Sequence, residues 1–384
     1  MSDVLKMHEA ENDLSILQPI VDPWYESIRN PKEAQEIVLS ELSKEYGKTR
    51  YGKKHSASKI RNIEDFRASF PILNYKQLDP YLAAVRKGDN SSILPEPLVC
   101  WVMTRGSTGA AKVLPATRKH LEQILTCGAR ALVNYVRRRN DLDILTGNIL
   151  NLNFPSAVHI VNTDGRRMTY GYSSGTYAKL NPALGNVSLI PRQEEIDAIG
   201  SGIRKGDWHR RFELVYAAAL GKNVTATMGV TPVILSFAKY INRMHKQKPK
   251  QLWNPHALFC TSVRKIQFKY APVLSEYFGH VPVVEIYSAT EGVFAQQLDD
   301  LPYVTPNYDK YLFEVVTGKG TKMLHELRRG EWGRLIISSC MFPRYDIGDM
   351  IEAAGNNYFR VFGRRKVSTL LEHRLYRLFF RGFL

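Results

Sequence analysis

The sequence lacks several features that would assign a class at once. No apolar run approaches the roughly 20 residues needed to cross a bilayer, and residues 1–10 lack the apolar core of a signal peptide. The four cysteines among 384 residues are scattered and form no CxxC pair, which disfavours a disulfide framework. We therefore expect a cytoplasmic protein with buried thiols and no membrane span.

Acidic residues are also scarce, since 53 Lys and Arg residues face 37 Asp and Glu residues and give a net charge of +16. The basic clusters are short and dispersed, at residues 137–139, 246–250 and 364–366. No RNA-binding aromatic motif, zinc finger or helix-turn-helix pattern accompanies them. We expect no specific nucleic-acid partner. Binding through the basic surface stays an alternative, and steep loss of binding with salt would reveal it.

What the sequence does contain is an ordinary globular composition, 44% apolar and 23% charged. Helical and strand patterns alternate in its second half. The helix candidates are residues 208–220 and 231–244, and the strand candidates are residues 223–228 and 257–262. This alternation predicts an α/β fold with a largely buried parallel sheet.

A glycine-containing stretch, Thr104–Pro115, follows the apolar strand candidate Leu98–Met103 and precedes a helical pattern that starts near Thr117. Its residue types suit phosphate, because glycines permit close backbone approach while hydroxyls, amides and a lysine supply donors and charge. We expect the following helix to carry the turn on its N-terminus. The stretch is no Walker A loop, and an ordinary surface turn is the alternative. The candidate phosphate ligands are Gly106, Ser107, Thr108, Gly109 and Lys112.

Two later motifs give this turn a context. Residues 281–292 form a β-branched strand candidate that ends in a small-residue turn at Glu291, and Phe342–Asp349 follows the strand candidate 334–339. A phosphate turn, a strand ending in an aromatic and a carboxylate, and then R-Y-x-x-G-D resembles the motif order of the adenylate-forming (ANL) superfamily. The chain resembles in particular its GH3 branch, the auxin-responsive promoter family of acyl-acid amido synthetases. Matching stretches extend over roughly residues 30 to 367.

The resemblance implies a reaction and assigns roles. Such enzymes use ATP and Mg²⁺ to convert a small carboxylic acid to an acyl-adenylate, and the amido synthetases then conjugate the acyl group to an amino acid. Lys112 would bind phosphate, Glu291 would coordinate Mg²⁺, and both would be catalytic. The other implied nucleotide contacts are Tyr287 stacked on adenine, Asp349 on the ribose, Arg364 on the ribose or α-phosphate, and Ser288 and Thr290 nearby. The implied acyl-pocket residues are Thr261, Ser262, Val263 and Tyr172.

The family pattern also implies a domain organisation. It predicts an α/β adenylate-forming large N-terminal domain, with mostly parallel sheets flanked by helices and a helical N-terminal segment, in residues 1–363. Residues 364–384 would be a hinge stub without the C-terminal cap domain, so that turnover would be weakened unless a partner supplies the cap. Arg105 and Asp346 depart from the family pattern, in the phosphate turn and in R-Y-x-x-G-D respectively.

Three other functions compete with this interpretation. An acyl-CoA ligase-like enzyme would use a thiol acceptor, and a truncated nucleotide- or acyl-binding protein would lack full catalysis. Residues 171–175 also fit the G-x-S-x-G nucleophile elbow of serine hydrolases, with Ser173 as nucleophile. We expect no hydrolase, because residues 166–170 make a poor buried strand and no helical pattern follows before Pro182.

Overall fold

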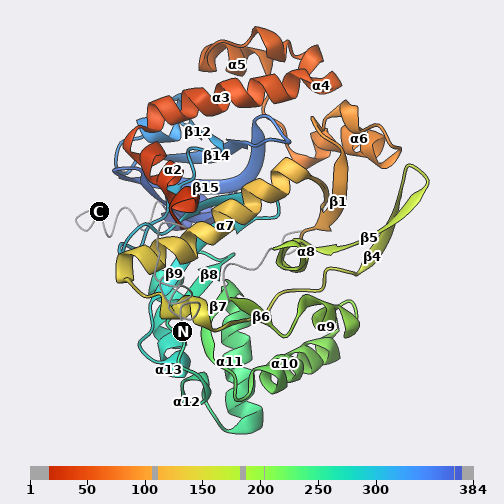
Figure 1. Ribbon diagram of the computed structural model, residues 1–384. Helices are drawn as coiled ribbons and strands as arrows, with labels where there is room; N and C mark the ends of the chain where they lie inside the picture. The colour runs from red at the N-terminus through yellow and green to blue at the C-terminus, as the bar shows by residue number, and fades with distance from the viewer. Residues whose placement is uncertain (1–16, 106–110, 182–186, 203, 367, 374–384) are drawn as a thin grey trace, which may run out of the picture.

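The computed structural model describes residues 17–105, 111–181, 187–202, 204–366 and 368–373, in which helices surround three β-sheets (Figure 1). The phosphate turn's Gly106, Ser107, Thr108 and Gly109 lie outside these residues. The N-terminal helices form the upper part of the molecule as drawn. They are α2 (Gln18–Arg29), α3 (Pro31–Gly47), α4 (Arg50–Lys54), α5 (Ile63–Ser69) and α6 (Tyr75–Arg86).

Local caps define where these helices begin. Pro31 lies at the start of α3, where its missing N–H is no loss. Asn62 caps α5 by accepting from the Asp65 amide, and Asn74 forms a capping box with Gln77 at the start of α6. The sequence positions of these helices are therefore fixed by short-range hydrogen bonds before any tertiary contact is made.

A four-stranded sheet holds the phosphate turn. Its strand order is β2 (Val113–Thr117), β1 (Leu98–Met103), β5 (Arg166–Tyr172) and β4 (His159–Thr163). β1 pairs antiparallel with β2, so the turn is the loop of a β-hairpin. The expectation that a helix carries the turn on its N-terminus is wrong: residues 113–117 form a strand first, and α7 (Arg118–Arg139) begins only after it.

The central sheet has seven strands in the order β11 (Thr305–Pro306), β10 (Gly292–Gln296), β9 (Val283–Ala289), β8 (Ala257–Thr261), β7 (Val224–Val230), β3 (Asn148–Leu150) and β6 (Ser188–Ile190). Pairing is parallel from β9 to β6, which confirms the predicted α/β class. The remaining helices of this part are α8 (Ser173–Leu180), α9 (Gln193–Ala198), α10 (Lys205–Ala219), α11 (Thr231–His245), α12 (Pro249–Leu252) and α13 (Ala271–Phe278).

A third sheet of five strands is wholly antiparallel, in the order β13 (Gly320–Met323), β12 (Leu312–Thr317), β14 (Trp332–Ser338), β15 (Tyr345–Gly355) and β16 (Tyr358–Arg364). The expectation of mostly parallel sheets therefore holds only for the part of the central sheet from β9 to β6 and for the β1–β5 pair. Parallel neighbours need a long crossover, whereas short turns such as residues 356–357 between β15 and β16 leave only antiparallel pairing available.

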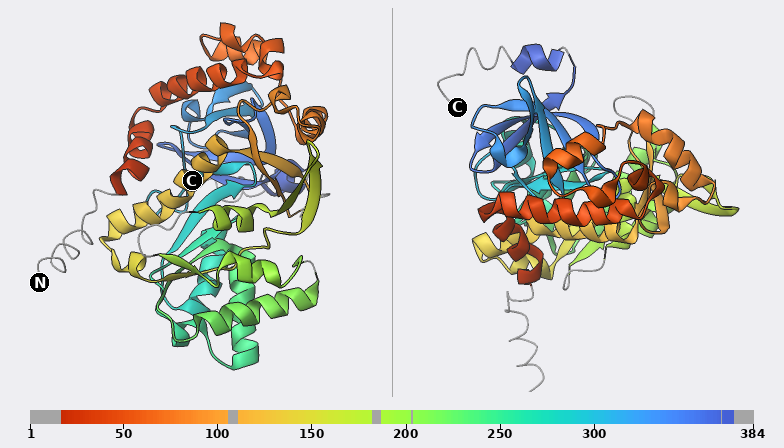
Figure 2. Two further views of the ribbon diagram at one scale, coloured as in Figure 1. Left: turned by 45° about the vertical axis from the view of Figure 1, so that its right-hand side comes forward. Right: turned by 90° about the horizontal axis from the view of Figure 1, so that it is seen from above.

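Helix α7 runs across the middle of the molecule and joins the upper and lower parts (Figures 1 and 2). It packs on β10 and α2, and many of its residues are buried, including Leu132, Val133 and Val136. One apolar core lies between the N-terminal helices, α7 and the five-stranded sheet, and a second lies among α10, α11 and the lower strands. The candidate site lies where these parts meet.

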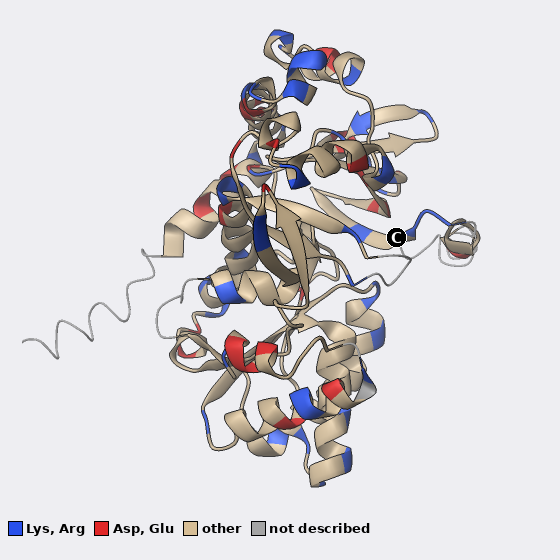
Figure 3. Ribbon diagram, turned by 90° about the vertical axis from the view of Figure 1, so that its right-hand side faces the viewer, with Lys and Arg blue, Asp and Glu red and all other residues tan. Residues whose placement is uncertain are grey.

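The basic residues show no single concentration. Figure 3 shows Lys and Arg spread over several elements, with acidic residues among them. In the cluster at residues 137–139, Arg137 pairs with Asp22, and both Arg138 and Arg139 pair with Asp300. All four cysteines are free thiols, as expected. Within the described residues, no helix is long and apolar enough to cross a membrane.

A buried ion pair anchors α7. The Arg130 guanidinium is fully buried and donates to both carboxylate oxygens of Asp309, at 2.7 and 2.5 Å, and to Asn307 Oδ1 at 2.7 Å. Replacing Asp309 by Asn should lower the free energy of unfolding by about 3–5 kcal/mol, because it leaves a buried charge unpaired. Urea unfolding measures this. The control Glu122→Gln breaks the exposed pair with Arg118 and should cost less than about 1 kcal/mol; equal effects would contradict the prediction.

Candidate active site

Two hydrogen bonds between Thr104 and Lys112 close the neck of the phosphate turn. The Thr104 amide donates to the Lys112 carbonyl at 2.9 Å, and the Lys112 amide donates to Thr104 Oγ1 at 2.9 Å. Tyr75 secures the same strand, since its hydroxyl accepts from the Val113 amide at 3.1 Å and lies 3.2 Å from the Val113 carbonyl. These bonds hold Thr104 and Lys112 together at the base of the turn.

Lys112, Tyr345 and Glu291 meet at this neck from three different strands or turns. Lys112 Nζ donates to Tyr345 Oη at 2.9 Å and lies 3.6 Å from Glu291 Oε1. Tyr345 Oη in turn donates to Glu291 Oε1 at 3.1 Å. Lys112 is half-buried and Glu291 is buried, so their charges interact in surroundings that screen them less than water does. Burial and the neighbouring carboxylate raise the pKa of Tyr345, which keeps its proton on the phenol.

A second cluster joins Tyr287, Asp349 and Arg364. The Tyr287 hydroxyl donates to Asp349 Oδ2 at 2.8 Å, and Arg364 Nε lies 2.9 Å from Asp349 Oδ1. Burial raises the pKa of Asp349 and outweighs the lowering effects of Arg364 and Tyr287. The Tyr287 ring meets Phe294 and Phe359 on the core side, with ring centres 5.6 and 5.9 Å apart. The structure thus brings together three residues that lie far apart in the sequence.

The expected acyl-pocket residues are only partly gathered. Thr261 Oγ1 lies 2.7 Å from Ser288 Oγ, which ties the end of β8 to β9 beside Tyr287. Ser262 has a left-handed backbone with φ of +76°, so the chain turns sharply after β8. Val263 packs against the lower core. Tyr172 comes from a different sheet, where it pairs with Met103 at the end of β1.

Ser173 connects Tyr172 to the turn between β9 and β10 that carries Glu291. Its hydroxyl lies 3.1 Å from Thr290 Oγ1, and Tyr177 of the same helix donates to the Thr290 carbonyl at 2.8 Å. The expectation that no helix follows this serine is wrong, because α8 begins at Ser173 after the exposed strand β5. The structure places no histidine against Ser173 among the described residues, so the strand–helix context carries no hydrolase chemistry.

Sequence reasoning missed three tyrosines of this site. Tyr75, Tyr177 and Tyr345 supply the hydroxyls that fix Val113, Thr290 and Glu291. The only available signal was the position of Tyr345 inside R-Y-x-x-G-D. The neighbouring departure, Asp346, pairs with Arg334 at 2.5 Å, and Arg344 is buried against Glu314 at 2.9 Å, so both support the sheet. Arg105 lies with its guanidinium 5.5 Å from the centre of the Phe154 ring.

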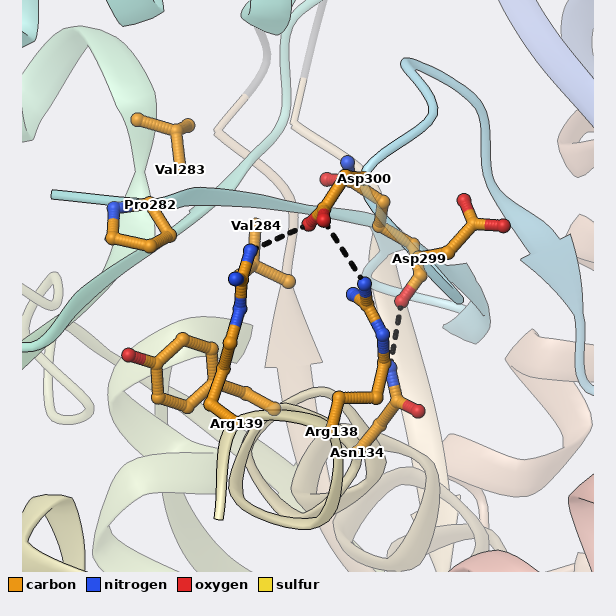
Figure 4. A pocket seen from close by; sticks show the side chains of 10 residues that line it. Asn134, Arg138, Arg139, Pro282, Val283, Val284, Asp299 and Asp300 are labelled. Carbon is orange, nitrogen blue, oxygen red and sulfur yellow. Dashed lines mark hydrogen bonds and ion pairs between the residues drawn. The ribbon is translucent and has the colours of Figure 1, made fainter. Parts of the chain in front are cut away.

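A small cavity elsewhere is no rival site. It lies between the C-terminal end of α7 and β9, lined by residues such as Asn134, Arg138, Pro282 and Asp300 (Figure 4). Its volume of about 30 Å³ accommodates ordered water at most. The two arginines at its edge are already paired with Asp300.

Comparison with known proteins shows what parts of this arrangement are similar to. Residues 23–194, which include the phosphate turn and Tyr172, match the GH3 family N-terminal domain. The chain is 29% identical over 116 residues to indole-3-acetic acid-amido synthetase GH3.2 of Arabidopsis thaliana, a stretch that covers 30% of this chain and 20% of that protein. A probable indole-3-acetic acid-amido synthetase, GH3.11 of Oryza sativa subsp. japonica, is 28% identical over 96 residues, 24% of this chain and 16% of that protein. These alignments thus span a fifth or less of the curated relatives.

Solved structures extend the likeness to most of this chain. AtGH3.15 acyl acid amido synthetase, in complex with 2,4-DB, superimposes with a TM-score of 0.75 at 14% identity, covering 92% of this chain and 72% of that chain. A 2-hydroxyisobutyryl-CoA ligase in complex with 2-HIB-AMP and CoA gives a TM-score of 0.63 at 16% identity, covering 88% and 69%. At such identities the likeness shows the fold alone.

Glu285, two residues before Tyr287 on β9, gives a pH-dependent test of this region. Burial raises the pKa of its carboxyl from 4.5 to about 7. The folded protein therefore holds this proton more tightly than the unfolded chain, and stability should fall as the pH rises from 4.5 to 7. Glu285→Gln should flatten that decline and, above pH 7, raise the free energy of unfolding by about 3 kcal/mol, at 1.36 kcal/mol per pKa unit.

Chemical denaturation between pH 4.5 and 8 measures this difference between wild type and variant. Glu276→Gln on the exposed face of α13 is the matched control and should leave the profile unchanged. A parallel shift of the whole profile in Glu285→Gln, with the same slope as wild type, would refute the assignment.

Proposed function

We propose that this protein activates a small carboxylic acid as an acyl-adenylate, using ATP and Mg²⁺, and then conjugates it to an amino acid. The observation that carries the proposal is the meeting of Lys112, Tyr345 and Glu291 at the neck of the phosphate turn, beside the Tyr287–Asp349–Arg364 cluster. The GH3 domain match and the adenylate-forming fold support it. The site assignments below are part of the proposal.

The residues around Glu291 fit a magnesium ion that is shared with phosphate. Both contacts from Lys112 and Tyr345 go to Oε1, and among the described residues no donor meets Oε2. Magnesium commonly takes one or two carboxylates from the protein and fills its other positions with water and phosphate oxygens. No group of three metal-ligating side chains exists in the described part of the chain, so a cage made by the protein alone is not proposed. Glu291 Oε2 would hold the ion.

The Asp349 cluster fits a nucleoside. Tyr287 and Arg364 each use one oxygen of the carboxylate and orient it. Each carboxylate oxygen can accept more than one hydrogen bond, so ribose hydroxyls could donate to the remaining positions. The Tyr287 face that does not meet Phe294 and Phe359 would stack on adenine. Ser288 and Thr290 lie on the same strand and turn.

The chain's own residues would act by charge and position. ATP supplies the phosphoryl group that turns the carboxylate into a good acyl donor. Lys112 would place its charge against phosphate oxygens, and Tyr345, whose raised pKa keeps the phenol protonated, would keep Lys112 and Glu291 at a fixed separation. Such preorganised charge stabilises the transition state because no reorganisation is needed during the reaction. Thr261, Ser262, Val263 and Tyr172 would border the acid.

Three further expectations belong to this proposal. The division into a large domain of residues 1–363 and a hinge stub of residues 364–384 stays a prediction, as does a partner that supplies a cap. A cytoplasmic location also stays a prediction. An acyl-CoA ligase-like activity is the alternative, which the fold shared with a CoA ligase makes worth testing.

Carboxylate-dependent exchange of labelled pyrophosphate into ATP tests the first step. With a panel of aryl, indolic and fatty acids, wild type should exchange with at least one acid only when Mg²⁺ is present. Glu291→Gln and Lys112→Met should each lower the exchange rate about 10²–10³-fold, the usual effect of removing one preorganised electrostatic group. Glu276→Gln is the control. Exchange that persists at the wild-type rate in Glu291→Gln would overturn the site assignment.

The same reaction separates the two possible acceptors. With the responding acid, addition of amino acids should yield an amide, whereas coenzyme A should yield no thioester. Thioester formation would support the ligase alternative instead. Binding of ATP without exchange for any acid would leave a nucleotide-binding protein as the better description.

A further inference from the structure

Arg211 is a buried cation without a visible counterpart. It lies in α10, its side chain is 0% exposed, and all three of its guanidinium nitrogens lack a hydrogen-bond partner among the described residues. No carboxylate in the described chain pairs with it. In the same helix, Asp207 pairs with Arg210 instead, at 2.5 Å, and Glu213 pairs with Tyr240 and His245. An arginine has five N–H groups and no acceptor, so all five N–H groups of Arg211 lack an acceptor among the described residues.

Aromatic rings and bare backbone form the surroundings of Arg211. Its guanidinium carbon lies 4.5 Å from the centre of the Trp208 ring and 5.4 Å from that of Phe154. Gly202, with φ of +69°, brings the backbone so close that a Cβ there would lie 2.1 Å from Nη2. Ring faces attract the cation but leave its in-plane N–H groups unmet. Burial accordingly lowers the pKa of Arg211 to about 10.

The Arg211 environment adjoins the candidate active site. Phe154 packs on Tyr172, with ring centres 5.0 Å apart. The next residue, Ser173, contacts Thr290, which immediately precedes Glu291. From the other direction, Arg105 at the edge of the phosphate turn lies over the same Phe154 ring. Two guanidinium groups therefore approach one ring on the acyl side of the site, and neither is paired with a carboxylate among the described residues.

An unpaired buried charge destabilises the folded state because it has lost its hydration, and proteins pair or neutralise such groups. The planar fork of an arginine matches a carboxylate, whose two oxygens accept two parallel hydrogen bonds. A carboxylate held in this way has both oxygens engaged, so it is a poor nucleophile for phosphorus. A carboxylate at Arg211 would also be separated from Glu291 by Tyr172 and Ser173. The reacting carboxylate, in contrast, must lie next to the phosphates. The Arg211 partner is therefore a different carboxylate from the one that reacts.

We propose that Arg211, which lies against Trp208 and Phe154, binds the second carboxylate of a dicarboxylic acid substrate. This inference rests on the proposed function for the identity of the reacting group. The acid approaches from the side of Arg105, whose exposed side chain lies over Phe154. One end of the acid then lies at the nucleotide and the other at Arg211, with aromatic faces along the connecting chain.

Binding of matched acids without ATP tests this inference. Terephthalate and adipate are compared by calorimetry with their monomethyl esters, which have nearly the same size and one charge fewer. Wild type should bind each dicarboxylate at least about tenfold more tightly than its ester, beyond the twofold statistical advantage of two equivalent ends. Arg211→Met should abolish this preference and change the affinity for the ester less than about twofold.

Two controls keep the result interpretable. Arg210→Met removes the neighbouring, exposed positive charge and should retain the preference, which excludes a general charge effect. Arg211→Lys keeps the charge without the fork and should give an intermediate preference, which also serves if Arg211→Met fails to fold. Without ligand, Arg211→Met should melt at the same or a higher temperature than wild type, because it removes an unpaired buried charge; a merely structural arginine would show a clear loss.

Failure of this inference differs from failure of the proposed function. Equal affinity of wild type for diacid and ester, or a diacid preference that survives in Arg211→Met, would overturn the role of Arg211. If pyrophosphate exchange with a monocarboxylic acid were then observed, acid activation would stand. Another outcome is a diacid preference in wild type that is lost in Arg211→Met, together with no pyrophosphate exchange for any acid. That result would support the Arg211 subsite and refute the proposed acid-activating function.

Discussion

One hydrogen-bonded chain determines how the candidate site is assembled. Lys112 donates to Tyr345, and Tyr345 donates to Glu291, so a phenol stands between a cation and a carboxylate delivered by three separate parts of the fold. The four-stranded sheet supplies Lys112, the antiparallel sheet supplies Tyr345, and the turn after the central parallel sheet supplies Glu291. Their relative positions depend on every sheet being in place. Residues outside the site, such as the ion pair between Arg130 of α7 and Asp309, therefore contribute to the geometry of the site by holding the fold together.

Burial explains why the two carboxylates of the site, Glu291 and Asp349, are surrounded by hydrogen-bond donors. Glu291 and Asp349 are both buried, and each is met by one tyrosine hydroxyl and one basic side chain. Hydrogen bonds to a phenol satisfy a carboxylate without a second full charge. Arg211 breaks this rule, since the described chain supplies rings but no acceptor. A ligand that carries the missing acceptor accounts for the difference.

Sequence patterns predicted what short-range physics determines. The βα alternation gave the parallel centre of the fold, and the motif order led to Lys112, Glu291, Tyr287, Asp349 and Arg364, which the structure does place in two adjoining clusters. Two local errors arose because β2 has only five residues and β5 is partly exposed, so that tertiary pairing, rather than periodicity, creates both strands. The burial of Arg211 and the bridging role of Tyr345 could not be predicted from the sequence, because both depend on contacts between residues far apart in the chain.

The most direct test of the account is a crystal structure with a non-hydrolysable ATP analogue and Mn²⁺, whose anomalous signal locates the metal ion. We expect the ion on Glu291 Oε2, phosphate oxygens against Lys112, and the ribose hydroxyls on Asp349. A nucleotide bound elsewhere, or bound at this site with its metal ion and ribose away from Glu291 and Asp349, would contradict the proposed site and the chemistry built on it.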